Sequence, residues 1–227
     1  MKPARVGVDP RSTMRVGVRT ERARTERVAA CPRAVATVGA PTAVADALAR
    51  QLGAGPFALV LVFAAPTVDR SGLAAALRTR FAGTPVLGCT TAGEIGSDGL
   101  SQETVTAVAL PQAWFRVETH LVRDVNAFGL AESRELVRRM RARLAEGGTE
   151  PIAENTFALL LVDGLAGAEE FLASRLDSAL GDVARVGGSA GDGLRFAHTH
   201  VFADGTAHEG AAVLALVQTS LPFEVFN

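Results

Sequence analysis

Two stretches of the chain, residues 57–110 and 157–217, repeat one order of elements: an apolar strand, an amphipathic helix, a second strand and a glycine-rich turn. The first strands read FALVLV and FALLLV, and each turn closes on one carboxylate, Glu94 or Asp192. A repeat of this kind predicts two similar halves related by a pseudo-twofold axis. We therefore expect an α/β (α+β) fold in which two pseudo-symmetric strand–helix–strand–hairpin units form mixed sheets flanked by helices.

Composition and charge divide the chain into two regions. The 227 residues are 48% hydrophobic and 21% charged, which is typical of a globular domain. The net charge of −1 hides a basic beginning: residues 1–33 hold nine basic and three acidic residues, a net +6, and leave −7 for the rest. We predict a disordered basic extension over residues 1–33, or extra residues ahead of a true start at Met14. Residues 34–227 then form the domain, with repeat units of about 57–122 and 157–227.

The basic beginning has an alternative interpretation as an arm for nucleic acid or anionic lipid. No aromatic residue is interleaved with its arginines, so stacking on bases is unsupported and we expect no nucleic-acid partner. Residues 1–33 also lack the apolar stretch of a signal peptide, and the longest strongly apolar run, residues 57–66, is too short to span a bilayer. The two cysteines, Cys31 and Cys89, make a disulfide framework unnecessary. These features predict a cytoplasmic protein without membrane insertion.

Hydrophobic periodicity locates the elements of the first half. We expect strands over residues 34–38, 57–63 and 86–89, with the central one covered on both faces. The first helix presents Val44, Leu48 and Leu52 on one face; Asp69 or Thr67 caps the second, whose buried stripe is Leu73, Leu77 and Phe81. Residues 105–110 and 114–122 are predicted to pair as a hairpin, and a long helix to span residues 130–144.

The second half repeats this order. Strands are expected over residues 157–162 and 183–186, separated by a helix that buries Phe171, Leu172, Leu176 and Leu180. A half-exposed strand over 195–202, a tight Asp204-Gly205 turn and a return strand over 210–217 follow. By the logic of the repeat, residues 223–227 match the start of the strand that contains Trp114. We therefore expect the chain to stop in its last strand and to leave an unclosed sheet edge.

The two glycine-rich loops are the best candidates for a binding site. Each begins where a buried strand ends, and each offers hydroxyls, backbone amides freed by glycine, and one acid. Exposed amides bind anions and the acid binds a cationic group, which suits a small zwitterion such as an amino acid. Asp163 follows a strand end directly, where the first unit has Phe63, so it is a third candidate acid. The predicted ligand-binding residues are Thr90, Thr91, Gly93, Glu94, Asp163, Gly188, Ser189, Gly191 and Asp192. The alternative is that both loops are tight turns whose acids cap neighbouring amides.

Two kinds of chemistry have weaker support. Residues 187–191 satisfy the pattern G-x-S-x-G, but a nucleophile elbow needs a helix directly after Ser189, and the sequence there predicts a strand. Cys89 lies at a strand end, where a thiolate can be activated, but we favour the interpretation that it is a small buried apolar residue. His198, His200 and His208 could meet on a zinc ion, but no cysteine or paired acid completes the spacing, and we interpret them as the polar face of a hairpin. We expect no metal and no cofactor.

Three motifs in order resemble the N-terminal FIST domain family: GCTTAGE at residues 88–94, LVDG at 161–164 and GGSAGDG at 187–193. The resemblance implies a sensory, ligand-binding module of bacterial signalling proteins, without catalytic residues and with amino acids as the proposed ligand class. Family members usually continue into a C-terminal FIST domain, so it also implies such a domain, a signalling partner or self-association as the partner. Our leading hypothesis is a non-enzymatic small-molecule sensor. The alternatives are an enzyme using Cys89 or Ser189, or a protein-interaction scaffold.

Overall fold

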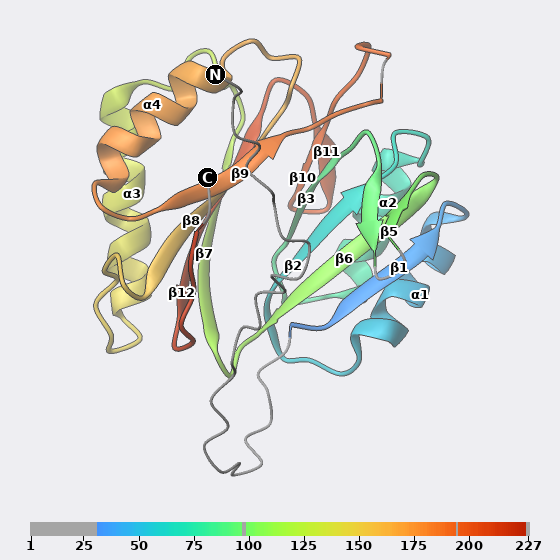
Figure 1. Ribbon diagram of the computed structural model, residues 1–227, viewed down its shortest axis with the longest axis horizontal. Helices are drawn as coiled ribbons and strands as arrows, with labels where there is room; N and C mark the ends of the chain where they lie inside the picture. Colours follow the sequence, from blue (N-terminus) through green and yellow to red (C-terminus); the bar gives the residue numbers. More distant parts are fainter. Residues whose placement is uncertain (1–30, 97–98, 194, 226–227) are drawn as a thin grey trace, which may run out of the picture. The chain divides into compact units, whose positions relative to one another are not determined.

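The computed structural model describes residues 31–96, 99–193 and 195–225, which form four helices and three β-sheets (Figure 1). Most of the predicted basic extension therefore lies outside the described residues. The predicted mixed α/β class is confirmed, whereas the pseudo-twofold relation between the halves stays a prediction. None of the helices in the described residues is long and apolar enough to cross a membrane.

The larger sheet has six strands, and all its neighbours are antiparallel except β2 and β3. Its strands in spatial order are β1 (Arg33–Thr37), β6 (Thr104–Pro111), β2 (Phe57–Ala64), β3 (Val86–Thr90), β10 (Val201–Ala203) and β11 (Thr206–His208). Helix α2 (Arg70–Arg80) makes the crossover between the two parallel strands, as the sequence predicts. The carboxyl ends of β2 and β3 therefore lie at the same end of the sheet.

The second sheet has four strands, again with one parallel pair, β8 and β9. Its strands in spatial order are β7 (Phe115–Val122), β12 (Ala212–Thr219), β8 (Thr156–Val162) and β9 (Arg185–Ser189). Helix α4 (Glu169–Leu180) connects the parallel pair. A separate small hairpin consists of β4 (Glu94–Gly96) and β5 (Gly99–Ser101).

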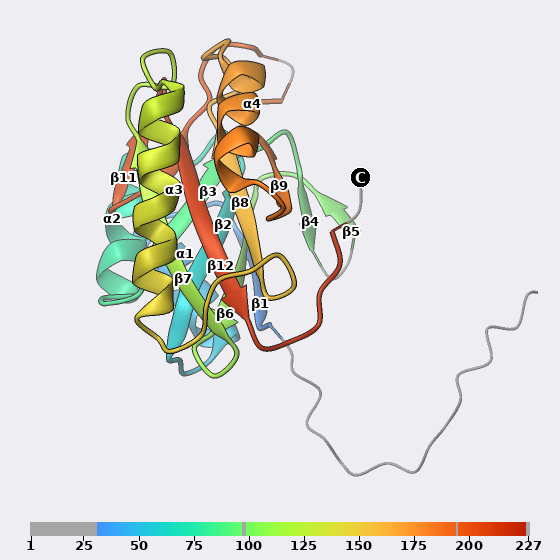
Figure 2. The same ribbon diagram turned by 90° about the vertical axis from the view of Figure 1, so that its left-hand side faces the viewer.

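The two sheets pack face to face between two layers of helices (Figure 1). Helices α1 (Pro41–Leu52) and α2 cover the outer face of the six-stranded sheet. Helices α3 (Leu130–Ala145) and α4 lie side by side over the outer face of the four-stranded sheet (Figure 2). Strand β12 explains this layering, because Leu214 and Leu216 pack toward the helices while Val213, Ala215 and Val217 pack toward the other sheet. A strand buried on both faces has no polar side to present to water.

Local sequence signals set the helix ends as predicted. The Asp69 carboxylate accepts a hydrogen bond from the amide of Gly72 (3.0 Å), which caps α2, and Leu73 and Leu77 are each 1% exposed on its buried face. Helix α1 begins at Pro41, where the missing N–H would have no partner in any case. The predicted inward residues of α3, Leu136, Val137, Met140 and Leu144, are all buried.

The predicted hairpin of residues 105–110 and 114–122 is wrong. These residues form β6 and β7, but β6 pairs with β1 and β2 while β7 pairs with β12 in the other sheet. Pro111 ends β6, and its carbonyl accepts the amide of Trp114 (3.1 Å), so the short link turns the chain from one sheet into the other. Alternation along a strand reports which face is buried, but not which strand lies beside it.

Three further expectations for the second half fail. Phe171 is 67% exposed on α4 although Leu172, Leu176 and Leu180 are buried. Residues 195–200 are not a strand, because the Asp192 carboxylate binds three amides of that segment; only Val201–Ala203 pair, as β10. The last strand is β12, a central strand that ends at Thr219, and residues 220–225 form no strand, so the expected open edge at the chain end is wrong. The edges of this sheet are β7 and β9.

We predict that substitutions at two adjacent positions of α4 differ sharply in their effect on the stability of the protein. Leu172→Ala removes a fully buried side chain and should lower the free energy of unfolding by about 2–5 kcal/mol. Phe171→Ala removes an exposed ring that stacks only against Arg175 (5.9 Å) and should cost about 0.5 kcal/mol. Urea unfolding followed by circular dichroism measures both, and equal losses would contradict the layering described above.

Candidate functional site

The two glycine-rich loops meet in space. Thr90 is the last residue of β3, and Gly191 follows the end of β9 in the other sheet. The amide of Gly191 donates to the carbonyl of Thr90 (2.9 Å). A Cβ on Gly191 would lie 3.2 Å from the amide nitrogen of Ala92, so glycine is what allows this close approach. The two loops thus converge at the carboxyl ends of β3 and β9, as a shared site requires.

A pocket of about 150 Å³ lies at this junction and takes residues from both loops. The turn between β5 and β6 closes its other side. Its lining is Ala65, Pro66, Ala92, Gly93, Glu94, Gln102, Glu103, Asp192, Gly193 and Arg195. Three acidic residues and one arginine therefore line a small space, and the acids outnumber the cation.

Glu94 is a buried acid that two hydroxyls hold in place. It is 2% exposed. Its Oε1 accepts a hydrogen bond from the hydroxyl of Thr91 (2.6 Å) and its Oε2 one from Thr104 (2.8 Å). Hydrogen bonds to the ionised form make burial of a carboxylate tolerable. Glu94 therefore presents a fixed orientation to the pocket.

Asp192 shapes the loop that follows it. Its Oδ2 accepts the amides of Ala197 (2.7 Å) and His198 (3.0 Å), and its Oδ1 accepts the amide of Phe196 (2.9 Å). These amide bonds, led by that of Ala197, hold the pKa of Asp192 below its ordinary value, and the guanidinium of Arg195 acts in the same direction. This is the capping role of the alternative interpretation, in a residue that also lines the pocket.

Asp163 and Thr90 lie outside the pocket lining, in the interior. The Asp163 carboxylate accepts the Thr199 hydroxyl and the amides of Leu165 (3.0 Å) and Gly210 (2.5 Å). Thr90 is fully buried, and its hydroxyl accepts the amide of His200 (3.1 Å). Asp163 therefore ties together the segments around Leu165, Thr199 and Gly210, while Thr90 joins its loop to the segment at His200.

The remaining predicted residues divide between the pocket and the sheet edge. Gly93 lines the pocket, and Thr91 acts on it through Glu94. Gly188 and Ser189 lie on β9, exposed, and are not among the lining residues. Sequence reasoning missed Glu103 and Arg195. Glu103 has a positive φ of 57°, and its carboxylate accepts a hydrogen bond from the hydroxyl of Thr67 (2.6 Å). No sequence motif predicts either feature.

The structure gives little support to Cys89 or Ser189 as a nucleophile. Cys89 is 3% exposed, and burial raises the pKa of its thiol to about 12, so the thiolate is scarce near neutral pH. Within the described residues no helix follows Ser189, which a nucleophile elbow requires.

The three histidines do not form a metal site. His198 Nδ1 and His200 Nε2 both contact Glu209 Oε1, at 3.1 and 3.2 Å, while His208 Nε2 lies 3.4 Å from the carbonyl of Ala203. Burial lowers the pKa of His200, which favours its neutral form. Across the part of the chain that the structure describes, no group of three or more His, Cys, Asp or Glu residues could hold a metal ion.

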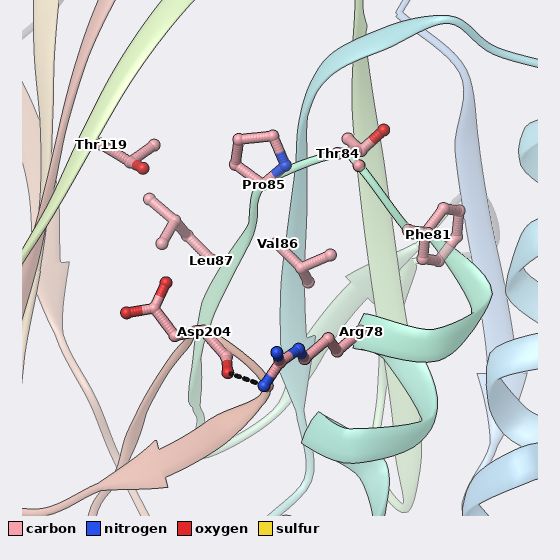
Figure 3. Close-up of a pocket in the computed structure, with 10 residues that line it drawn as sticks. Arg78, Phe81, Thr84, Pro85, Val86, Leu87, Thr119 and Asp204 are labelled. Carbon is pink, nitrogen blue, oxygen red and sulfur yellow. Dashed lines mark hydrogen bonds between the residues drawn. The ribbon is translucent and has the colours of Figure 1, made fainter.

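Larger cavities lie away from the loops, and two of them border β7 and share Pro85. One is about 460 Å³ and contains Arg78, Leu87, Thr119 and Asp204 (Figure 3). The other is about 450 Å³. Neither contains a residue of the glycine-rich loops. Volume alone would favour this region for a ligand, but the chemistry singled out by the sequence gathers in the smaller pocket.

Comparison with known families gives a match to the FIST N domain over residues 58–227, about three quarters of the chain. This range includes both glycine-rich loops, all the lining residues of the pocket, and the strands β7, β8, β9 and β12. No curated protein matches the chain.

We predict that Asp192→Asn loosens the loop of residues 195–198 in a pH-dependent way. Because the pKa of Asp192 is lowered in the folded state, its stabilising effect is present above the unfolded pKa of about 3.9 and is lost as the pH falls through the lower, folded value. The melting temperature of the wild type should exceed that of the variant above about pH 4, and the difference should shrink under more acid conditions. Asp182→Asn, the same change on an exposed acid, is the control. A difference that does not vary with pH would contradict this role.

Proposed function

The chain belongs to the FIST N domain family, a family of sensory and signalling domains, and from that premise we propose that it is a sensor of a small cationic or zwitterionic metabolite of the amino-acid class. The ligand binds in the pocket between the two glycine-rich loops. One observation carries this proposal: both loops supply an acid to one small pocket that also contains a single arginine.

The charges of the pocket select the ligand class. Glu94, Glu103 and Asp192 against Arg195 give three acids and one base, a net charge of −2. A ligand with an ammonium or guanidinium group offsets the carboxylates, and Arg195 matches a carboxylate on the same ligand through paired N–H donors. An anionic ligand without a cationic group would face uncompensated repulsion.

The acids of the pocket have different roles in this proposal. Glu94 and Asp192 already accept hydrogen bonds from the protein, which orients them and limits what they offer a ligand. Glu103 is the most available of the three, since Thr67 occupies one of its two carboxylate oxygens. We therefore assign the main contact with the cationic group to Glu103, with Glu94 behind it.

The volume of the pocket sets the size of the ligand. A space of about 150 Å³ equals the liquid volume of about five water molecules. This fits the head of an amino acid, with the side chain pointing outward past the loops. The free cysteines, Cys31 and Cys89, fit a reducing compartment, so we place the sensor in the cytoplasm. Its output passes to a C-terminal FIST domain, a signalling partner or a second copy.

Calorimetric titration of the full chain tests the proposal with L-lysine, L-arginine and succinate as probes. We expect one of the cationic amino acids to bind and succinate, a dicarboxylate without a cationic group, not to bind. Glu103→Gln should weaken binding about tenfold, because a charge-assisted hydrogen bond is lost. Glu132→Gln, the same change on the exposed face of α3, should leave affinity unchanged. Failure of both cationic probes, or equal affinity in Glu103→Gln and wild type, would overturn the proposal.

A further inference from the structure

Among the residues that the structure describes, strand β7 has a free edge along its whole length. Its eight residues pair with β12, from Phe115 opposite Thr219 to Val122 opposite Ala212. Within residues 31–96, 99–193 and 195–225, no other strand pairs with it. Every second residue of β7 therefore presents an N–H and a C=O that β12 does not use. Natural proteins usually shorten, bend or cover such an edge, because it is a template for another strand.

Two cavities border this edge, and we call them together the cleft. They measure about 460 and 450 Å³, share Pro85, and are both lined by residues of β7. Figure 3 shows Thr119 of β7 across a gap from Leu87 and Asp204. Val117 and Leu121 belong to the core between the sheets but are only partly buried. The edge thus combines unpaired backbone groups with an incompletely covered apolar surface.

Basic side chains stand on both sides of the cleft. Arg78 on α2 forms one wall, and its guanidinium donates to the carbonyl oxygen of Asp204 (3.3 Å) (Figure 3). Arg116 of β7 is exposed on the other wall, beside Arg143 of α3. Arg143 contacts Glu118 (3.4 Å), so the charges of this pair offset each other. The charged residues that line the two cavities are three arginines and two acids, three minus two, a net charge of +1, with Asp204 as the second acid at one end.

The other edge of the same sheet lacks these features. Strand β9 is only five residues long, its glycines offer no side-chain pockets, and neither cavity includes it. Backbone pairing alone gives affinity without choice of partner, whereas pockets for alternate side chains add specificity. Only β7 offers both.

We propose that β7 is a docking edge for an extended, acidic segment of a partner protein, which adds to the four-stranded sheet as a fifth strand. Apolar residues of the segment alternate inward over Val117 and Leu87 and complete the core between the sheets. Acidic residues alternate outward toward Arg116 and Arg143. This mode of recognition takes its affinity from main-chain hydrogen bonds and its specificity from the side chains between them. It rests on the edge, the cleft and the charges, and not on the ligand pocket.

Fluorescence anisotropy with two labelled nine-residue peptides tests the docking edge on the full chain. One peptide alternates valine and glutamate, and its counterpart alternates valine and lysine. We expect the acidic peptide to bind at least tenfold more tightly than the basic one, and to bind more weakly as salt is raised. Hydrogen exchange should slow in residues 115–122 and not in residues 185–189 when the acidic peptide is present.

Matched charge reversals locate the contact. Arg116→Glu, an exposed change on β7, should weaken binding of the acidic peptide at least tenfold, and Arg134→Glu on the exposed face of α3 should not. No binding, equal binding of the two peptides, or protection that avoids β7 would overturn the proposal. So would a dimer that protects residues 115–122 without any peptide, because the occupant would then be a second copy.

Discussion

Thr90 is the point at which the two sheets are tied together. Its amide donates to the carbonyl of His200 (2.9 Å), its hydroxyl accepts the amide of His200 (3.1 Å), and its carbonyl accepts the amide of Gly191 (2.9 Å). Three of its polar groups are thus used inside a fully buried environment, where an unpaired group would cost about 1–3 kcal/mol. Because Thr90 ends β3 and Gly191 follows β9, this junction fixes the distance between the loops. The pocket exists only because that distance is short.

Buried acids then arrange the chain around the junction. Asp163 and Asp192 together bind five backbone amides: three from the segment before β10, one from the segment before β12, and that of Leu165 after β8. These segments have no strand partners over residues 195–200, so carboxylates replace the ladder hydrogen bonds they lack. Asp192 caps a turn, as the alternative interpretation of the loop acids predicted, and it also lines the pocket; its role in ligand binding stays a proposal. Strand β3 also connects the two proposed contact regions, with Pro85 and Leu87 in the cleft near its start and Ala92, Gly93 and Glu94 in the pocket lining after its end.

Periodicity predicted the parts of the fold that depend on one element at a time. The buried faces of α1, α2 and α3 follow directly from apolar spacing, and the capping role of Asp69 from its residue type. The change of sheet between β6 and β7 was not predictable, because the sequence of a strand does not encode its neighbour. Phe171 fits the helical spacing of its neighbours but lies beyond the edge of the stripe, where α4 faces water. The sequence predicted part of the pocket, because both glycine-rich loops and their acids are recognisable as motifs. Glu103 and Arg195 were not predicted, because the folding of distant segments brings them to the pocket.

The pocket depends on the convergence of the two loops, and the exchange rate of one amide reports whether they converge. In an assigned NMR spectrum of the full chain, we expect the amide of Gly191 to exchange as slowly as the hydrogen-bonded amides of β3 and β9, because it is bonded to the carbonyl of Thr90. Exchange at the rate of an open loop, with β3 and β9 still protected, would show that the loops do not meet. The shared pocket would then lose its basis.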